Sequence, residues 1–335
     1  MTPRERGIGL ALVVISACGF GSGALFAKPI YGAGVDWLTL LAWRFLFAAL
    51  VSWAWLLAWP AHRLALRRLS RRAVLVLMLL GLLYMGNSGT YFAGLETVPA
   101  SLAALIVYLY PALVAVMSIR FARRLEGRRA WGALALASAG VALAVGGIEP
   151  GAAPPMSGLL LIVASPIIYA IWIIMAARLG GERARATDER AAVPPYDSET
   201  TPEPEQTPPA SAAAIMVTAT AVGWWIAAVA SGRPVHPADI PAEAWLPLLG
   251  VGIVATALAI QAFYAGARRI GAAQASLAST VEPVYTIGLA TVLFGERLGP
   301  VQVVGGILVI VGVVIAQSGE LRRASHRLAA VDPTT

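Results

Sequence analysis

Ten long apolar segments dominate this chain and restrict what it can fold into more than any other feature of the sequence. An α-helix needs roughly 20 mostly apolar residues to cross a bilayer, and lipid admits only helices and closed β-barrels. Only 13% of the 335 residues are charged, whereas about 25% is typical of a soluble domain. Because the runs are long and continuous rather than short and alternating, we predict an all-α polytopic membrane protein with ten transmembrane helices. The predicted helices cover approximately residues 8–28, 37–58, 73–95, 98–119, 130–147, 157–177, 211–231, 245–267, 272–294 and 301–318.

The basic residues predict how the helices are oriented, because cytoplasmic segments of membrane proteins are enriched in Lys and Arg. With a cytoplasmic N-terminus, 21 of the 25 basic residues fall in cytoplasmic segments, three lie at the outer ends, and Arg44 lies within a span. We therefore expect a multi-pass protein of the inner (cytoplasmic) membrane with both termini in the cytoplasm. The net charge of +7 is spread over these short segments, so a nucleic-acid partner is not expected.

The second half of the chain repeats features of the first half. An offset of 172 residues aligns segment 91–111 with segment 263–283, which places Pro111 over Pro283. An offset of 149 residues aligns another set, Ser16, Phe20 and Gly23 with Ser165, Tyr169 and Trp172. The common order predicts that helices 1–5 are repeated as helices 6–10. Because five is odd, the second copy would cross the membrane in the opposite direction, as in transporters with a substrate site between inverted repeats.

Three stretches of sequence resemble one known family. They are "LETVPASLAALIVYLYPALVAVM" and "LEGRRAWGALALASAGVAL" in the first half and "RRIGAAQASLASTVEPVYTIGLATVLFGERLGPVQVVGGILVIVGVVI" in the second. With "LAWRFLFAAL" of helix 2, they resemble the EamA-type ten-helix transporters of the drug/metabolite transporter (DMT) superfamily. The resemblance implies a ten-helix fold and a transport function, but it specifies the substrate poorly.

The repeats and the polar stretches divide the chain into five parts. Segment 181–210 is rich in Pro, Glu, Thr and Ala, which favours a disordered cytoplasmic linker. The predicted parts are 1–150 (the first EamA-like repeat), 151–180 (helix 6), 181–210 (the linker), 211–320 (the rest of the second repeat) and 321–335 (a cytoplasmic tail).

We expect a secondary transporter that moves a small organic metabolite or amino acid by alternating access, as an exporter. A carrier of phosphorylated sugars or nucleotide sugars is an alternative within the superfamily, but such substrates call for several buried cations and Arg44 is alone inside a span. A non-transporting membrane sensor is a second alternative. No nucleotide-binding, metal-ligand or paired-carboxylate pattern is seen, so we expect no enzyme and no cofactor. The expected partners are the substrate and the lipid bilayer, with a homodimer left open.

Glu282 is one of few ionisable residues within a predicted span, and such residues usually face the bundle interior. It is a candidate proton carrier or, alternatively, a structural carboxylate bonded to freed backbone groups or to Arg44. Its equivalent in the first half is Tyr110, which cannot act in the same way. Pro111 and Pro283 each withhold a helix hydrogen bond, and we predict kinks that act as hinges. For Arg44 a carboxylate partner is favoured over direct substrate contact.

Polar and aromatic residues recur at helical spacing on several predicted spans, and amides facing lipid would be costly. We therefore predict that they line a substrate cavity. The candidate substrate-binding residues are Arg44, Tyr84, Asn87, Tyr91, Tyr108, Trp172, Gln261, Tyr264 and Glu282.

Overall fold

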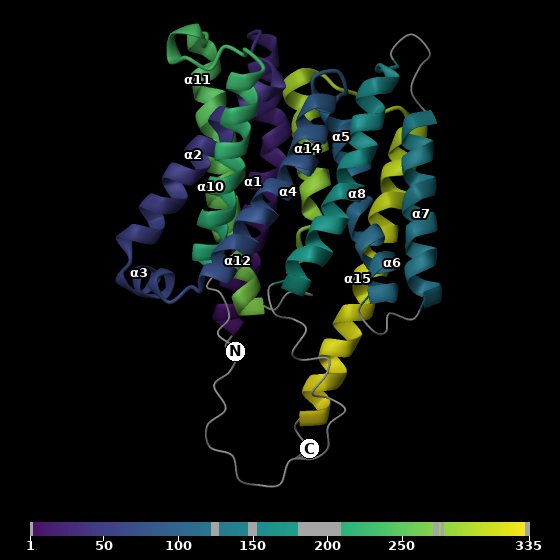
Figure 1. The fold of residues 1–335 in the computed structure, drawn as a ribbon. Coiled ribbons are helices and arrows are strands. Elements are labelled where there is room, and N and C mark those ends of the chain that lie inside the picture. The colour runs from purple at the N-terminus through teal and green to yellow at the C-terminus, as the bar shows by residue number, and fades with distance from the viewer. Residues whose placement is uncertain are drawn as a thin grey trace.

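The computed structural model describes the backbone of residues 3–121, 127–146, 153–179, 209–270, 275 and 278–331. Within this part of the chain all regular elements are helical (Figure 1). The predicted linker lies outside the described residues except for its last two positions, and so do residues 332–335 of the predicted tail. The all-α class is therefore confirmed for the residues described.

Six helices are long and apolar enough to cross a membrane. They are α1 (Pro3–Gly32), α2 (Trp37–Ala58), α4 (Arg71–Leu95), α8 (Met156–Leu179), α10 (Pro209–Ala230) and a continuous rod formed by α11 (Ala242–Leu249), the π-helix η2 (Gly250–Leu258) and α12 (Ala259–Ile270). Shorter apolar helices lie in α5 (Ala100–Val107) with α6 (Tyr110–Phe121), in α7 (Gly127–Gly146), in α14 (Val281–Phe294) and in α15 (Pro300–Val331). Two further short helices, α3 (Pro60–Arg67) and η1 (Pro237–Asp239), lie in connections. The multi-span prediction is confirmed, and the count of ten remains a prediction.

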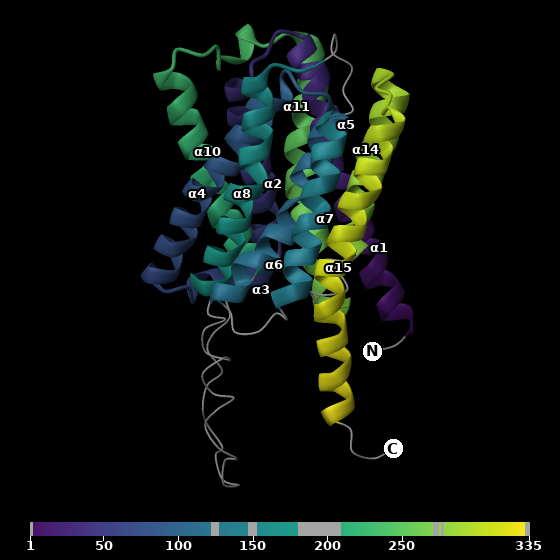
Figure 2. The same ribbon diagram turned by 90° about the vertical axis from the view of Figure 1, so that its right-hand side faces the viewer.

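The helices form a bundle in which α1 begins and α15 ends at the same end (Figures 1 and 2). The most extensive packing joins α7 to α15, α1 to α12, α2 to α10, and α4 to α8. Each of these pairs brings together one helix from the first half of the chain and one from the second. Segment 321–335, predicted as a tail, is helical as far as Val331.

The two prolines predicted to kink long helices instead stand at the start of new helices. The helix predicted over 98–119 is broken between α5 and α6, and Pro111 is the second residue of α6. Pro283 is the third residue of α14. A proline fits the first turn because the N–H that it lacks would have no partner within the helix. The physical correction is that each proline marks a break rather than a bend.

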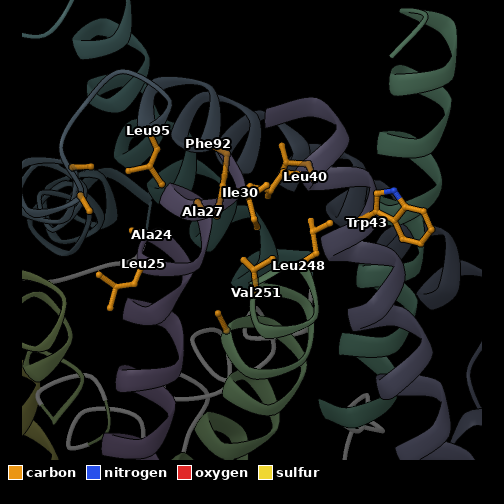
Figure 3. Packing of buried hydrophobic residues seen from close by; sticks show 14 of the residues in the cluster. Ala24, Leu25, Ala27, Ile30, Leu40, Trp43, Phe92, Leu95, Leu248 and Val251 are labelled. Atoms are coloured by element: carbon orange, nitrogen blue, oxygen red, sulfur yellow. The ribbon is translucent and has the colours of Figure 1, made fainter. Parts of the chain in front are cut away.

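The core of the bundle is built from small and branched side chains at the ends of α1, α2 and α4 (Figure 3). Ala24 and Ala27 of α1 are almost fully buried and let neighbouring helices approach closely. Ile30 fills the same region from the last turn of α1. Leu95 at the end of α4 and Leu248 on α11 are also completely buried. This packing fixes one end of the bundle tightly.

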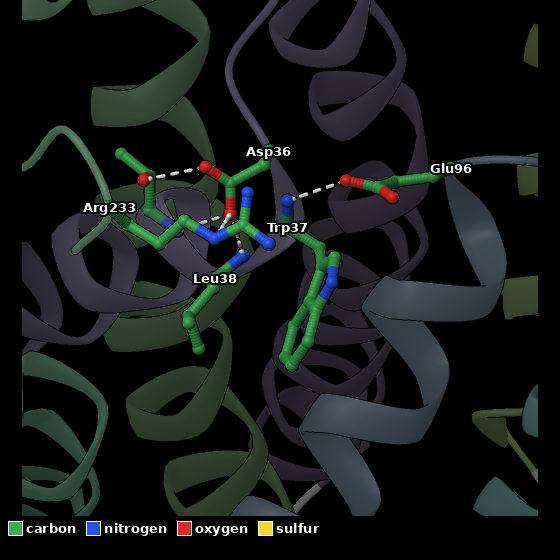
Figure 4. Close-up of polar contacts among 6 residues, drawn as sticks. Asp36, Trp37, Leu38, Glu96 and Arg233 are labelled. Carbon is green, nitrogen blue, oxygen red and sulfur yellow. Dashed lines mark hydrogen bonds and ion pairs between the residues drawn. The ribbon is translucent and has the colours of Figure 1, made fainter. Parts of the chain in front are cut away.

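Polar contacts close the same end (Figure 4). Asp36 begins α2 as its N-cap, with Oδ1 accepting from the N–H groups of Leu38 and Thr39. Arg233, which follows α10, lies 3.9 Å from that carboxylate. Glu96, which follows α4, accepts a hydrogen bond of 2.7 Å from the Trp37 N–H. Elements from both halves of the chain are thereby joined at this end.

Candidate functional site

Glu282 and Tyr108 connect the two helix breaks. The single hydrogen of the Tyr108 hydroxyl is shared between two acceptors, the backbone carbonyl of Ser279 at 2.6 Å and Oε2 of Glu282 at 3.1 Å. Pro283 cannot supply the helical N–H that would otherwise reach the Ser279 carbonyl. Tyr108 therefore gives this carbonyl a second donor beside the Glu282 N–H, which lies 3.0 Å from it. It also ties the break between α5 and α6 to the first turn of α14.

Aromatic rings continue from this contact across the bundle. Tyr108 lies against Tyr110, with ring centroids 5.9 Å apart, and Tyr110 lies 4.9 Å from Tyr169 of α8. Tyr169 is stacked on Trp172 at 5.8 Å, and Trp172 meets Tyr84 of α4 edge-on at 5.4 Å. Adjacent contacts of this kind form one continuous series of rings. We call these five residues the aromatic cluster.

Arg44 lies on α2 beyond the Tyr84 end of the aromatic cluster. Its side chain is 6% exposed, and its Nε donates to the Thr256 hydroxyl at 2.9 Å. The guanidinium carbon stands 4.5 Å from the Phe92 ring centroid and 5.0 Å from that of Phe45. These are cation–π distances. The favoured carboxylate partner is absent, because among the described residues no carboxylate forms an ion pair with Arg44.

Thr256 belongs to the π-helix η2, and this explains how its hydroxyl reaches Arg44. The hydroxyl also donates to the carbonyl of Val251, five residues earlier, at 2.8 Å. A π-turn opens the backbone by one residue per turn and is found frequently at functional sites. The hydroxyl is thus fixed by its own helix while its oxygen accepts from Arg44.

Other predicted site residues are occupied by contacts between helices. The Ser165 hydroxyl donates to Oδ1 of Asn87 at 2.8 Å, which joins α8 to α4. The Trp172 indole N–H donates to the Leu80 carbonyl at 2.8 Å. Tyr91 packs against the ring of its neighbour Phe92 at 5.1 Å. Asn87 and Trp172 therefore join neighbouring helices of the site through hydrogen bonds, and the indole of Trp172 also stacks on Tyr169.

Within the part of the chain that the structure describes, two predicted residues of α12 form no hydrogen bond or ring contact with the aromatic cluster. Tyr264 of α12 contacts the ring of its neighbour Phe263 at 6.2 Å, and Gln261 on the same helix is half-buried. Two aromatic residues were omitted from the predicted site although they complete the cluster, namely Tyr110 and Tyr169. The alignment of the two halves pairs Tyr110 with Glu282 and places Tyr169 on the Ser165 stripe, so a signal for both was present.

A bundle of membrane-length helices that encloses a cation, a carboxyl group and a row of aromatic rings defines a multi-pass membrane protein with a polar interior. The profile of the EamA-like transporter family matches residues 7–146 and 204–317. The chain therefore belongs to the EamA-like transporter family, within the drug/metabolite transporter superfamily, and is a membrane transporter.

Comparison with curated proteins gives no match. Among solved structures, one described only as "Crystal structure of protein" is similar over 94% of this chain and 98% of the other, with a TM-score of 0.60 and 20% identity. At this identity the similarity concerns the fold alone. It extends to nearly the whole of both chains.

Proposed function

We propose that this protein is a secondary transporter that moves a zwitterionic metabolite of the amino-acid class across the cytoplasmic membrane by alternating access, in the export direction. The observation that carries the proposal is a pair of opposite charges inside the bundle. Arg44 is buried, Glu282 is half-buried, and within the described residues neither forms an ion pair. Charged groups in a membrane interior are costly and usually mark the path of a substrate or ion.

The residues between Arg44 and Glu282 indicate which chemical groups the ligand carries. The Phe45 ring beneath the Arg44 guanidinium lies 6.1 Å from the Tyr84 ring, so the aromatic cluster extends from the neighbourhood of Arg44 to Glu282. A ligand that carries a carboxylate and an ammonium could thus satisfy both charges across this gap. A planar guanidinium suits a carboxylate, which it binds with two parallel hydrogen bonds. Aromatic rings beside it suit an apolar side chain or an ammonium group.

A phosphorylated sugar or nucleotide sugar is less well matched. Such ligands carry several negative charges and need several buried cations. Within the described residues Arg44 is the one buried arginine, and the half-buried Lys28 donates to the carbonyls of Leu95 at 2.8 Å and Val98 at 2.6 Å. Lys28 is thus occupied at the end of α4.

Matching contacts in the two halves support the inverted repeats. The Ser16 hydroxyl donates to the Ala259 carbonyl at 2.7 Å, and the Ser165 hydroxyl lies 3.5 Å from the Asn87 carbonyl. Ser16 and Ser165 differ by 149 positions, and Asn87 and Ala259 by 172, which are the offsets of the sequence repeat. If the two halves of the chain are exchanged, the Ser16–Ala259 contact therefore becomes the Ser165–Asn87 contact.

A second matched pair accounts for the π-helix. A Cβ at Gly81 would strike the carbonyl of Met216, and a Cβ at Gly252 would lie 2.8 Å from the carbonyl of Arg44. Gly81 and Gly252 are 171 positions apart. The segments that follow them, 91–111 and 263–283, are aligned by an offset of 172, so the second half has one extra residue after Gly252. A π-turn is produced by one inserted residue. The extra residue falls within η2 and carries Thr256 toward Arg44.

The proposed orientation and motion rest on features of the ends and the breaks. The arginines of the α3 region lie at the end of the bundle where α1 begins and α15 ends (Figure 1), and the positive-inside rule assigns that end to the cytoplasm. Ten membrane crossings are consistent with this arrangement. Pro111 and Pro283 begin the helices that follow the two breaks, and we infer that these breaks act as hinges when one half moves against the other.

Counterflow in proteoliposomes tests the proposal, with an amino acid, its amide and its N-acetyl derivative as competitors. The amide lacks the carboxylate and the N-acetyl derivative lacks the ammonium group. We expect the free amino acid to compete best in the wild type. In Arg44→Gln its advantage over the amide should fall roughly tenfold or more while its advantage over the N-acetyl derivative remains. Glu282→Gln should give the reverse pattern.

Two results would contradict the assignment. One is an unchanged competition pattern in both variants, which would show that Arg44 and Glu282 do not bind the substrate. The other is the absence of counterflow for every zwitterion on a broad panel. A separate measurement tests coupling: if Glu282 carries a proton, a pH gradient should drive transport by the wild type and fail to drive it in Glu282→Gln, with counterflow as the control for a folded carrier.

A further inference from the structure

The connection between α2 and α4 carries a dense basic surface that the transport site does not use. It contains five exposed arginines within ten positions, Arg63, Arg67, Arg68, Arg71 and Arg72. From position 37 to position 95 the chain has no Asp or Glu. Among the described residues none of the five forms an ion pair. A concentration of unpaired positive charge at one end of a membrane bundle calls for an anionic partner.

Local structure holds this surface in one place. The short helix α3 follows α2 directly, and the Trp59 carbonyl accepts from the N–H groups of His62 and Arg63. Half-buried His62, Leu66 and Leu69 share one side, and α3 packs against α2 and α10. Arg63 and Arg67 are one turn apart and face away from that side. Ser70 then caps α4, with its hydroxyl accepting from the Ala73 N–H at 3.1 Å.

An aromatic pair borders the arginines. Trp55 and Trp59, one turn apart at the end of α2, have ring centroids 6.2 Å apart and exposed fractions of 44% and 53%. Leu57 and Leu64 are exposed nearby at 52% and 59%. Tryptophan is enriched at the boundary between lipid tails and head groups. The two indoles therefore place the arginines at the depth of the lipid head groups.

From these features we propose that the α3 surface, defined as Arg63, Arg67, Arg68, Arg71 and Arg72 with the Trp55–Trp59 pair, binds anionic phospholipid head groups of the leaflet at this end. Guanidinium groups match phosphate in charge and geometry. Basic clusters beside a membrane span are attracted to anionic lipid, and short amphipathic helices with Trp and Leu lie in the head-group region. The lipid chains of the same molecule would contact the exposed Leu and Trp side chains.

The occupant is lipid rather than a protein segment because the apolar and basic parts of the surface are adjacent. A soluble acidic peptide would satisfy the arginines but would leave the indoles and Leu64 without an apolar partner at the membrane boundary. A phospholipid supplies both a phosphate and hydrocarbon. The arginines of this surface lie on α3, directly after it and on the first turn of α4, whereas Tyr84 and Glu282 lie further along α4 and on α14, so the inference does not depend on the transported substrate.

Native mass spectrometry of the full-length protein tests the proposal, after reconstitution in equimolar phosphatidylglycerol and phosphatidylcholine. The wild type should retain phosphatidylglycerol preferentially. Arg63→Gln/Arg67→Gln should reduce this preference by roughly fivefold or more. Arg4→Gln/Arg6→Gln is the matched control, because it removes two exposed arginines from α1 at the same end and should leave the preference largely intact. An equal loss of the phosphatidylglycerol preference in both double variants would overturn the proposal, because it would show that the lipid is attracted by positive charge in general and not by a defined site.

Fluorescence quenching in proteoliposomes gives a second readout that does not require the arginine variant to fold. Brominated phosphatidylglycerol should quench wild-type tryptophan emission more than brominated phosphatidylcholine does. The difference should disappear in Trp55→Phe/Trp59→Phe, which removes the reporters beside the arginines. An equal quench by the two lipids in the wild type, or an unchanged difference in the tryptophan variant, would overturn the proposal. Retention of a co-purifying acidic protein in place of lipid would do so as well.

Discussion

Ser101 and Glu296 are 195 positions apart in the chain and are joined by two hydrogen bonds. The Ser101 hydroxyl and backbone N–H donate to Oε2 of Glu296 at 2.6 Å and 2.8 Å, and the Ala100 N–H donates to Oε1 at 2.9 Å. A carboxylate from the α14–α15 connection therefore caps the first turn of α5. Negative charge at a helix N-terminus is favourable. This cap also connects the two halves of the chain at the end where Asp36 meets Arg233.

Replacing Glu296 with Gln should destabilise the protein by about 2 kcal/mol, because one acceptor oxygen and the charge at the helix start are lost. Thermal unfolding in detergent is the measurement, with a lower midpoint expected. Glu243→Gln is the control: Glu243 is exposed in the first turn of α11, so its substitution should have a much smaller effect. Equal midpoints for the two variants would show that the cap contributes little.

Thr256→Val should weaken substrate binding more than it weakens the fold. The change keeps the shape of the side chain but removes the oxygen that accepts from Arg44 Nε, so the guanidinium loses its positioning contact. We expect the half-saturating substrate concentration in counterflow to rise several-fold. Thr256→Ser retains the hydroxyl and should restore the wild-type value. Failure of the serine variant to do so would indicate that the methyl group, and not the hydrogen bond, is what matters.

Tyr108→Phe should lower stability by about 1 kcal/mol, because the Ser279 carbonyl and Glu282 each lose a donor. The ring itself and its contact with Tyr110 are retained. If the two helix breaks move together during transport, the rate of counterflow should also change. A variant with unaltered thermal midpoint and unaltered counterflow would exclude a role for this hydroxyl in linking the breaks.

The hydropathy of the sequence predicted where the membrane-length helices lie because apolar runs are a direct requirement of the lipid environment. It did not predict the break at Tyr108 and Leu109, since a proline in an apolar run is compatible with either a bend or a new helix start. The π-helix η2 was also invisible, because the wider turn of a π-helix does not alter the hydropathy of an apolar run. The repeat offsets nevertheless aligned Ser16 with Ser165, and the two hydroxyls lie 2.7 Å and 3.5 Å from backbone carbonyls at matching positions, Ala259 and Asn87.

The candidate site was predicted less completely than the fold. Helical spacing placed Tyr84, Trp172 and Glu282 on polar stripes, and Tyr108 was predicted from its depth within a span. The structure connects the four through Tyr110 and Tyr169. No carboxylate of the described residues pairs with Arg44, and the sequence could not show this because it gives the number of acidic residues but no distances between helices. Rotation of each helix about its axis, which is set by packing, decides which stripes meet.

The contact between α7 and α15 offers a test of how close helix packing holds the two halves together. A Cβ added at Gly140 would lie 2.5 Å from the Gly305 carbonyl and 2.8 Å from the Val309 N–H. Because these are backbone atoms, Gly140→Ala must push the helices apart, and overpacking of this kind costs about 1–3 kcal/mol. Gly132 lies on the same helix, and a methyl group added there would have nothing within 4 Å, so Gly132→Ala should instead stabilise α7 by about 0.5–1 kcal/mol. The thermal midpoint should therefore fall in Gly140→Ala and rise in Gly132→Ala, although both variants make the same substitution on one helix. Shifts of the same sign and size in both variants would mean that the contact with α15 does not determine the effect.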